Sequence, residues 1–160
     1  GEISWYRNLD GNGTFSSEIV ITKKIDGGEY TTVGDFDHDG WLDLASASAS
    51  DNKIAWYRNI DGKGTFGPQI VVTTDAKGAR CVVVGDIDGD GWSDLISASY
   101  DDGKIAWYRN LDGKGTFSSQ KIITNKATYA ESVVVSDIDA DGFLDVASSF
   151  SSNDGNVAWY

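Results

Sequence analysis

Short stretches of β-branched and aromatic residues alternate along the chain with clusters of glycine, aspartate and asparagine. In the middle of the sequence the apolar stretches cover residues 82–85, 95–99, 104–109 and 120–124. Each has the length of a strand, and the clusters between them have the composition of turns. No stretch of useful length has the 3.6-residue spacing of an amphipathic helix. The pattern therefore predicts an all-β fold built from four-stranded antiparallel units.

This pattern repeats about every 51 residues. The motif Ile-Ala-Trp-Tyr-Arg-Asn occupies residues 54–59 and 105–110, with close relatives at 3–8 and 157–160. The turn motif Asp-Gly-x-Gly-Thr-Phe follows at 10–15, 61–66 and 112–117. Repeats of this length are typical of solenoids and propellers. We therefore interpret residues 1–160 as a single propeller segment with repeat units 1–29 (third and fourth strands), 30–79, 80–130 and 131–160 (first three strands).

The Trp-Tyr pair of the repeated motif favours a propeller. Alternate side chains of a strand point to opposite faces, so Trp56 and Tyr57 place large rings on both faces of their sheet. A sheet that is apolar on both faces must be covered on both, as the blades of a β-propeller are. We therefore expect packing between blades for the tryptophans of the motif, which are Trp5, Trp56, Trp107 and Trp159.

The number of repeats bears on the assembly. Propellers have four to eight blades, so three repeats cannot close a ring and would leave unpaired strand edges. Two chains supply six repeats. We therefore expect a homodimer that forms a six-bladed ring, in which the last strands of one chain pair with the first strands of the other. The motifs at 3–8 and 157–160 are both third strands, so one of them is surplus in such a ring.

A second repeated motif, Asp-x-Asp-x-Asp-Gly-x-x-Asp, follows the first strand of each unit that has one. Hard oxygen ligands in a tight loop suit Ca²⁺ better than zinc or copper, and the glycine permits the sharp turn. An EF-hand would need glutamate at position 12 and flanking helices, but position 12 is serine in all three copies. We therefore predict three calcium sites, with the carboxylates of positions 1, 3, 5 and 9 and the backbone carbonyl of position 7 as ligands. These residues are Asp35, Asp37, Asp39, Trp41 and Asp43; Asp86, Asp88, Asp90, Trp92 and Asp94; and Asp137, Asp139, Asp141, Phe143 and Asp145.

The net charge of −12 lies in these three loops. They hold 12 of the 25 acidic residues, and the 13 that remain equal the 13 Lys and Arg. Clustered carboxylates repel one another unless a cation offsets them. No basic face remains for nucleic acid, so we expect no such partner. No apolar run approaches the roughly 20 residues of a membrane span, so we also expect no membrane insertion.

The aspartate motif, the valine-rich strand before it and the Leu-x-x-Ser after it resemble the FG-GAP/VCBS repeats of integrin-like β-propellers. The resemblance covers essentially the whole chain, and Phe66-Gly67-Pro68 is loosely similar to the motif that names the family. It implies a calcium loop between the innermost and second strands of each blade. It also implies a ligand face opposite these loops, formed here by residues 26–30 with 50–52, 77–80 with 100–103, and 128–131 with 151–154. Fungal lectins of the Psathyrella type are similar in architecture.

The remaining residues indicate binding, not catalysis. With one histidine, His38, and one cysteine, Cys81, no nucleophile and base pattern is visible, and we expect no enzyme. We expect His38 to be an exposed loop residue and Cys81 to be buried. We hypothesise a lectin, because sugar sites combine aromatic rings with polar groups. The candidate ligand residues are Tyr30, Arg80, Tyr100, Tyr129 and Glu131.

Two alternatives remain open. The first is a module that binds an extracellular protein in place of a glycan, as integrin heads do. The second is an engineered or truncated propeller piece that self-assembles without a ligand. The close similarity of segments 54–66 and 105–117 favours this alternative, and the chain also has no Met and begins with Gly1. Calcium loops of this kind suit millimolar extracellular calcium, so we expect a secreted protein.

Overall fold

The protein is built from antiparallel sheets. A computed structural model of the chain describes residues 1–151 and 156–160. These residues form thirteen strands and no helix, and so contain no helix that could cross a membrane. The expected all-β fold class is therefore confirmed. The strands are β1 (Ile3–Trp5), β2 (Ile19–Thr22), β3 (Gly28–Gly34), β4 (Asp43–Ser48), β5 (Lys53–Tyr57), β6 (Ile70–Thr73), β7 (Ala79–Gly85), β8 (Asp94–Ser99), β9 (Lys104–Tyr108), β10 (Lys121–Thr124), β11 (Ala130–Ser136), β12 (Asp145–Phe150) and β13 (Asn156–Trp159).

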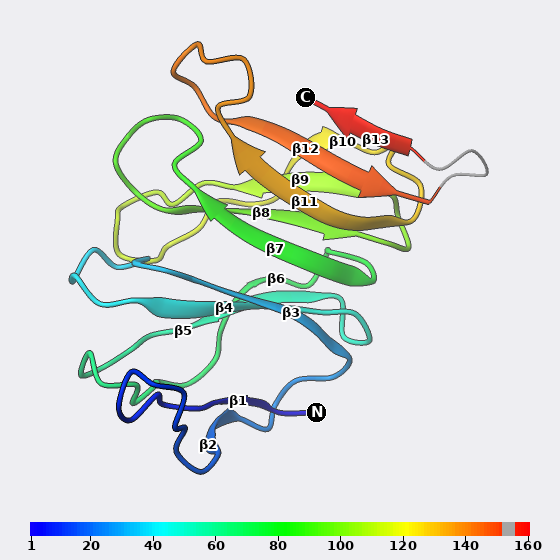
Figure 1. Cartoon of the computed structure of the whole chain (residues 1–160). Helices are drawn as coiled ribbons and strands as arrows, with labels where there is room; N and C mark the ends of the chain where they lie inside the picture. The colour runs from blue at the N-terminus through cyan, green and yellow to red at the C-terminus, as the bar shows by residue number, and fades with distance from the viewer. Residues whose placement is uncertain (152–155) are drawn as a thin grey trace.

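The strands form four sheets in which each strand pairs with its neighbours in the chain. Two complete blades have the orders β3-β4-β5-β6 and β7-β8-β9-β10. They lie between a two-stranded sheet, β1-β2, and a three-stranded sheet, β11-β12-β13. The four sheets are stacked one upon another, with β1-β2 and β11-β12-β13 at opposite ends of the stack (Figure 1). The arrangement is an open arc of propeller-like blades.

Small side chains allow the blades to pack closely. The second strands β4 and β8 read Asp-Leu-Ala-Ser-Ala-Ser and Asp-Leu-Ile-Ser-Ala-Ser, and every residue in them is buried. In the third strand β5, Trp56 and Tyr57 point to opposite faces, and both are almost completely buried. One core cluster joins Trp56 to Val82 and Leu95 of the next blade. The expectation that each sheet is covered on both faces is thus confirmed for the complete blades.

Tryptophan and glycine form the recurring contact between neighbouring blades. A Cβ on Gly64 would lie 2.1 Å from Cζ2 of Trp5, and one on Gly115 would lie 2.2 Å from Cζ2 of Trp56. Only glycine allows the hairpin between the third and fourth strands to approach the ring so closely. Packing between blades is therefore confirmed for Trp5 and Trp56. Trp159 in β13 differs, because 55% of it is exposed.

The two single-copy residues lie where the sequence placed them. Cys81 is buried in β7, and its Sγ lies 3.8 Å from the backbone oxygen of Val133 in β11. His38 is exposed in the loop after β3, with a φ of 58°. The equivalent residues of the other two loops, Gly89 and Ala140, have φ values of 70° and 63°. The left-handed backbone at this position therefore belongs to the loop itself.

Candidate functional site

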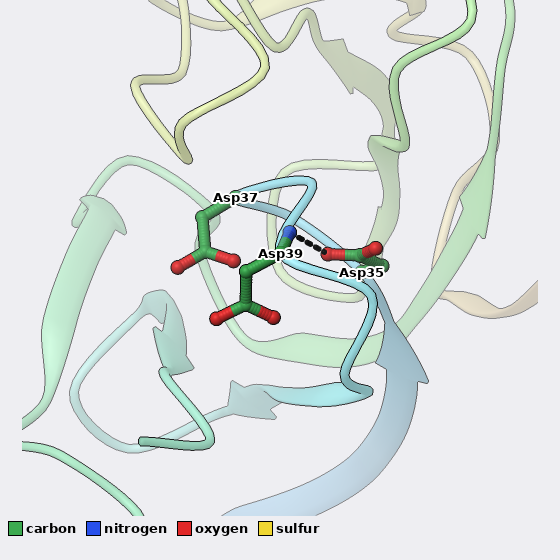
Figure 2. Close-up of side chains that lie close together, drawn as sticks. All are labelled: Asp35, Asp37 and Asp39. Carbon is green, nitrogen blue, oxygen red and sulfur yellow. Dashed lines mark hydrogen bonds between the residues drawn. The ribbon is translucent and has the colours of Figure 1, made fainter. Parts of the chain in front are cut away.

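The three aspartate motifs form tight loops between the first and second strands of a blade. In the first loop, carboxylate oxygens of Asp35, Asp37 and Asp39 lie within 4.8 Å of one another, close enough to share a metal ion. Figure 2 shows these three side chains gathered on one loop, with the backbone nitrogen of Asp39 donating to Asp35. The second loop has the equivalent group, Asp86, Asp88 and Asp90, whereas the group in the third loop joins Asp137 and Asp139 to Asp145 at position 9.

Backbone hydrogen bonds to the first aspartate fix the shape of each loop. The two carboxylate oxygens of Asp35 accept from the backbone nitrogens of Asp39, at 3.1 Å, and Gly40, at 2.9 Å. Asp86 and Asp137 accept the equivalent pairs of hydrogen bonds. Gly40 has a φ of 88°, which only glycine adopts without strain. The motif therefore adopts the same conformation in all three loops, and these backbone hydrogen bonds position its carboxylates.

The aspartate at position 9 has a different setting in the two complete blades. Asp43 is completely buried and accepts hydrogen bonds from the backbone nitrogens of Phe36, at 3.0 Å, and Asn59, at 2.7 Å. Asp94 has the same two partners in its blade, Ile87 and Asn110. Each oxygen keeps a second lone pair. The role of these carboxylates as metal ligands stays a prediction, while their role in joining the loop to the third strand is seen directly.

The electrostatics of the first loop suit a cation. Burial raises the pKa of Asp43 to about 6, even though the amides of Asn59 and Phe36 act in the opposite direction. Burial also raises the pKa of Asp37, and the neighbouring carboxylate of Asp39 raises it further. Oδ1 of Asp37 is buried and has no hydrogen-bond partner among the described residues. An orphaned carboxylate oxygen facing other carboxylates fits a hard divalent ion.

An arginine that the sequence analysis did not select closes the loop in both complete blades. The guanidinium of Arg58 pairs with Asp37 and, through Nη2 at 3.0 Å, with Asp39. Arg109 pairs in the same way with Asp88 and Asp90. These contacts hold two potential ligands of each loop in place from outside. The available signal was the Arg-Asn pair that ends the third-strand motif, which supplies both this arginine and the partner of the position-9 aspartate.

The third loop lacks these contacts. Oδ2 of Asp145 accepts from the backbone nitrogen of Ile138 at 2.9 Å, as in the other loops. Among the described residues, no arginine pairs with Asp139 or Asp141, and no asparagine donates to Asp145. The aromatic ring at position 7 of this loop also lacks the glycine contact that its equivalents make. Trp41 and Trp92 lie beside Gly62 and Gly113 of their own blades, whereas 72% of Phe143 is exposed. Ligation by the position-7 carbonyls stays a prediction in all three loops.

A second candidate site lies at the other end of the strands, where the second-to-third strand turns approach the next blade. The guanidinium carbon of Arg80 lies 4.9 Å from the ring centre of Tyr100, and Nη1 of Arg80 pairs with Glu29 at 2.8 Å. The rings of Tyr100 and Tyr129 lie 4.9 Å apart at an angle of 35°. Arg80 and Tyr100 belong to one blade, whereas Glu29 lies in the preceding blade and Tyr129 immediately precedes β11 of the next sheet. Stacking of the blades therefore brings Tyr129 to the pair Arg80 and Tyr100.

The other two candidate ligand residues lie apart from this cluster. Tyr30 lines a separate groove with Ile3 and Leu44. Glu131 is exposed and accepts a hydrogen bond from Ser151 at 3.3 Å. Part of the third pair of loops expected on this face, residues 152–154, lies outside the described residues.

Tyr129 has an unusual backbone. Its φ is 59°, and the equivalent residues of the earlier units, Gly27 and Gly78, have φ values of 62° and 61°. A bulky residue with positive φ is strained and is often found at functional sites. A cavity of about 270 Å³ lies beside this ring. Its lining consists of Tyr100, Asp101, Asp102, Gly103, Asn125, Thr128 and Tyr129, which we call the tyrosine groove.

Comparison with known proteins agrees with this architecture. Residues 1–46, 35–97 and 86–148 each match the FG-GAP-like repeat. A search of curated protein sequences finds no match. Among solved structures, the chain is similar to a lectin from Agrocybe aegerita, described as a structural basis of specific recognition of non-reducing terminal N-acetylglucosamine. The TM-score is 0.63 at 21% identity, over 98% of this chain and 45% of the lectin chain.

The structural likeness concerns the fold, because the identity is low and the chain spans less than half of that lectin. The repeat matches are more specific. They cover residues 1–148 without a gap, and two of them begin at the first aspartate of a loop, Asp35 or Asp86. By these matches the chain belongs to the FG-GAP-like repeat family.

Proposed function

We propose that the protein is a calcium-stabilised carbohydrate-binding module without enzymatic activity, secreted from the cell. The observation that carries the carbohydrate proposal is the tyrosine groove. Two tyrosine rings meet there beside carboxylate, amide and hydroxyl groups, and the guanidinium of Arg80 stacks on one of these rings. Sugars present apolar C–H faces that stack on aromatic rings and hydroxyls that need fixed polar partners. The similarity to a lectin fold supports the same class of ligand.

The groove offers each kind of contact that a sugar ring needs. Tyr129 is 48% exposed, so its ring is free to stack on a ligand. Next to the groove, the guanidinium of Arg80 is held by Glu29 and by the ring of Tyr100. Preorganised side chains lose little entropy when a ligand binds. Asp101 and Asn125 add hydrogen-bonding groups along the wall.

The groove occurs once among the described residues. The residues equivalent to Tyr100 and Tyr129 in the preceding unit are Ala49 and Gly78. Neither can stack on a sugar, so the proposal assigns one glycan site to each chain. The three calcium ions have a structural role in this account, because their loops lie at the opposite end of the strands.

The proposal includes a homodimer. An arc with two complete blades and two incomplete ones leaves sheet edges at both ends, and two such arcs supply the strands of a six-bladed ring. Closure protects the edges from non-specific pairing.

A glycan array tests the carbohydrate proposal, with free N-acetylglucosamine among the competing sugars. We expect binding that a free sugar displaces, and a loss of at least tenfold in affinity for Tyr100→Ala and Tyr129→Ala. Lys77→Ala is the matched control, because Lys77 is exposed on the same end of the protein but does not line the groove. Absence of glycan binding by a folded, calcium-loaded protein would contradict the proposal and favour a module that binds another protein.

A further inference from the structure

Residues at each end of the arc lack contacts that their equivalents make in the complete blades. The missing contacts at the two ends are complementary. In each complete blade, the Arg-Asn pair after the third strand completes the aspartate loop of that blade. β1 is the third strand of the incomplete first unit, and it is also followed by such a pair, Arg7 and Asn8. Arg7 instead donates from Nη2 to the backbone oxygen of Lys63 at 2.6 Å. Among the described residues, no carboxylate accepts from Arg7 or from the backbone of Asn8.

The third aspartate loop lacks the pair that Arg7 and Asn8 could supply. Asp139 and Asp141 have no arginine among the described residues, although their equivalents Asp37 and Asp39 share Arg58. The loop is acidic and Arg7 is basic, so the charges are complementary.

The glycine hairpins repeat the same complementarity. Gly62 and Gly64 contact Trp41 of their own blade and Trp5 of the preceding sheet. The equivalent glycines of the first unit, Gly11 and Gly13, have nothing within 4 Å of the Cβ position. By the 51-residue period, their missing partners are an exposed Phe143 and the ring of Trp107.

The first strand of the first complete blade, β3, also lacks a contact that its equivalent β7 makes. Cγ1 of Val84 in β7 lies 3.0 Å from the Cβ position of Gly34 in the preceding blade. Val33, the equivalent valine of β3, is instead 54% exposed. It lines a groove of about 590 Å³ with Trp5 and Ile21 of the two-stranded sheet. The residue equivalent to Gly34 that would face Val33 is Ser136, at the end of β11.

One chain cannot satisfy these contacts by itself, because β1-β2 and β11-β12-β13 lie at opposite ends of the stack (Figure 1). A second copy related by a two-fold axis can satisfy both vacancies at once, since each copy then offers its first sheet to the last sheet of the other.

β13 occupies the place that the partner strand would take. Ser148 of β12 pairs with Ala158, in the same register in which Ser46 of β4 pairs with Ala55. The strand is poorly covered, since 81% of Val157 is exposed, whereas Ile54 at the equivalent position is completely buried. β13 is thus one edge strand that β1-β2 can replace with a two-stranded unit.

We infer that β1-β2 of a second copy displaces β13 and pairs with β12, so that Arg7 and Asn8 of the partner complete the third aspartate loop. This inference rests on the proposed homodimer and specifies its interface. The exchange replaces a single exposed strand with two strands. It also places an arginine on the acidic loop and packs a glycine hairpin on Trp107. The third aspartate loop is then a site shared between subunits.

A disulfide trap tests the strand exchange directly. Ser4 is equivalent to Ala55 and Ala158, so the exchange places it opposite Ser148 of the partner. Paired residues of antiparallel strands have Cα atoms about 4.5–5.5 Å apart, within the range of a disulfide. In a Cys81→Ala background, we expect Ser4→Cys/Ser148→Cys to form a covalent dimer on oxidation.

The matched control is Ser148→Cys/Ala158→Cys, which forms a bond within one chain only if β13 keeps its place. Efficient closure of this second pair in a monomer, as measured by light scattering, would overturn the inference. A native dimer that does not cross-link through Ser4 and Ser148 would also overturn it. Glycan binding at the tyrosine groove is measured separately, so its failure would be distinguishable from failure of the exchange.

A second variant avoids any new bond. Gly13→Ala adds a methyl group that meets nothing within the subunit but would meet Trp107 of the partner. We expect the dimer dissociation constant to rise at least tenfold by analytical ultracentrifugation. Gly89→Ala is the control, because Gly89 also has positive φ and open space around its Cβ position, and lies in the loop of a complete blade. Equal dissociation constants for the two variants would contradict the inference.

Discussion

The backbone nitrogen of Asn59 lies 2.7 Å from Oδ1 of Asp43, to which it donates a hydrogen bond inside the first complete blade. Asn110 and Asp94 repeat this bond at the same distance. The last carboxylate of each aspartate motif thus fastens the metal loop to the hairpin that follows the third strand. Filling the loop with a cation should therefore stabilise two connections of the blade together.

Asp43→Ala is expected to lower the stability of the folded protein. The substitution leaves the buried amides of Phe36 and Asn59 without an acceptor. Each unsatisfied group costs about 1–3 kcal/mol, so we expect a loss of about 2–6 kcal/mol in the free energy of unfolding. Urea titration measures this loss, with Asp75→Ala as an exposed control. Equal effects of the two variants would show that the bond to Asn59 is unimportant.

Stability should depend on pH with opposite signs in the presence and absence of calcium. Burial raises the pKa of Asp43 to about 6, whereas an unfolded aspartate titrates near 3.9. Between these values the folded chain binds more protons than the unfolded chain, so the calcium-free protein loses stability as the pH rises. Burial acts in the same direction on Asp94, whose pKa is also raised.

With calcium bound, the order is reversed, because ligand carboxylates must be ionised to hold the ion. Melting curves of calcium-depleted and calcium-loaded protein between about pH 4.5 and 7.5 measure both trends. A calcium-depleted protein that becomes more stable as the pH rises would contradict the burial of an ionised Asp43.

Gly115→Ala should destabilise the contact between the two complete blades. The new methyl group would lie 2.2 Å from Cζ2 of Trp56, which is itself enclosed by the core. Overpacking of this kind costs about 1–3 kcal/mol beyond the backbone strain of a positive φ. Gly89→Ala supplies the strain without the collision. Thermal unfolding of the two variants separates the effects, and an equal loss in both would mean that this glycine is not needed for packing.

Tyr129→Gly should separate stability from binding. Glycine relieves the strain at a φ of 59° and removes an exposed ring contact worth about 0.5–1.5 kcal/mol. These effects are similar in size, so the melting temperature should not fall. Glycan affinity should nevertheless fall at least tenfold, because the ring facing the groove is lost. Wild-type affinity in this variant would move the ligand away from the tyrosine groove.

The local patterns of this chain predict much of its fold. Alternating apolar residues, glycine turns and the 51-residue period identify the strand types, and the spacing within residues 35–43 identifies the carboxylates that share a loop. These features depend on neighbours in the chain. The pair Trp56-Tyr57 adds that the blades are covered on both faces, because its two rings need separate hydrophobic partners.

Contacts made across turns and between blades were harder to foresee. Arg58 reaches Asp39 over 19 residues, and nothing in the motif alone shows that its side chain folds back over the loop. Arg80 meets Glu29 because the blades are stacked at a particular distance, and it meets Tyr100 because β7 pairs with β8 in the same blade. Tyr30, which was grouped with them by its place in the repeat, lies in another groove.

Calcium content and calcium-dependent melting test the central claim most directly. The account predicts three calcium ions per chain in protein equilibrated with calcium and analysed by mass spectrometry of the metal. Each site should add about 2.7 kcal/mol of stability at a calcium concentration 100 times its dissociation constant. Removal of the metal should therefore lower the melting temperature by about 10 °C or more. A protein that binds no calcium, and melts identically with and without it, would contradict the account.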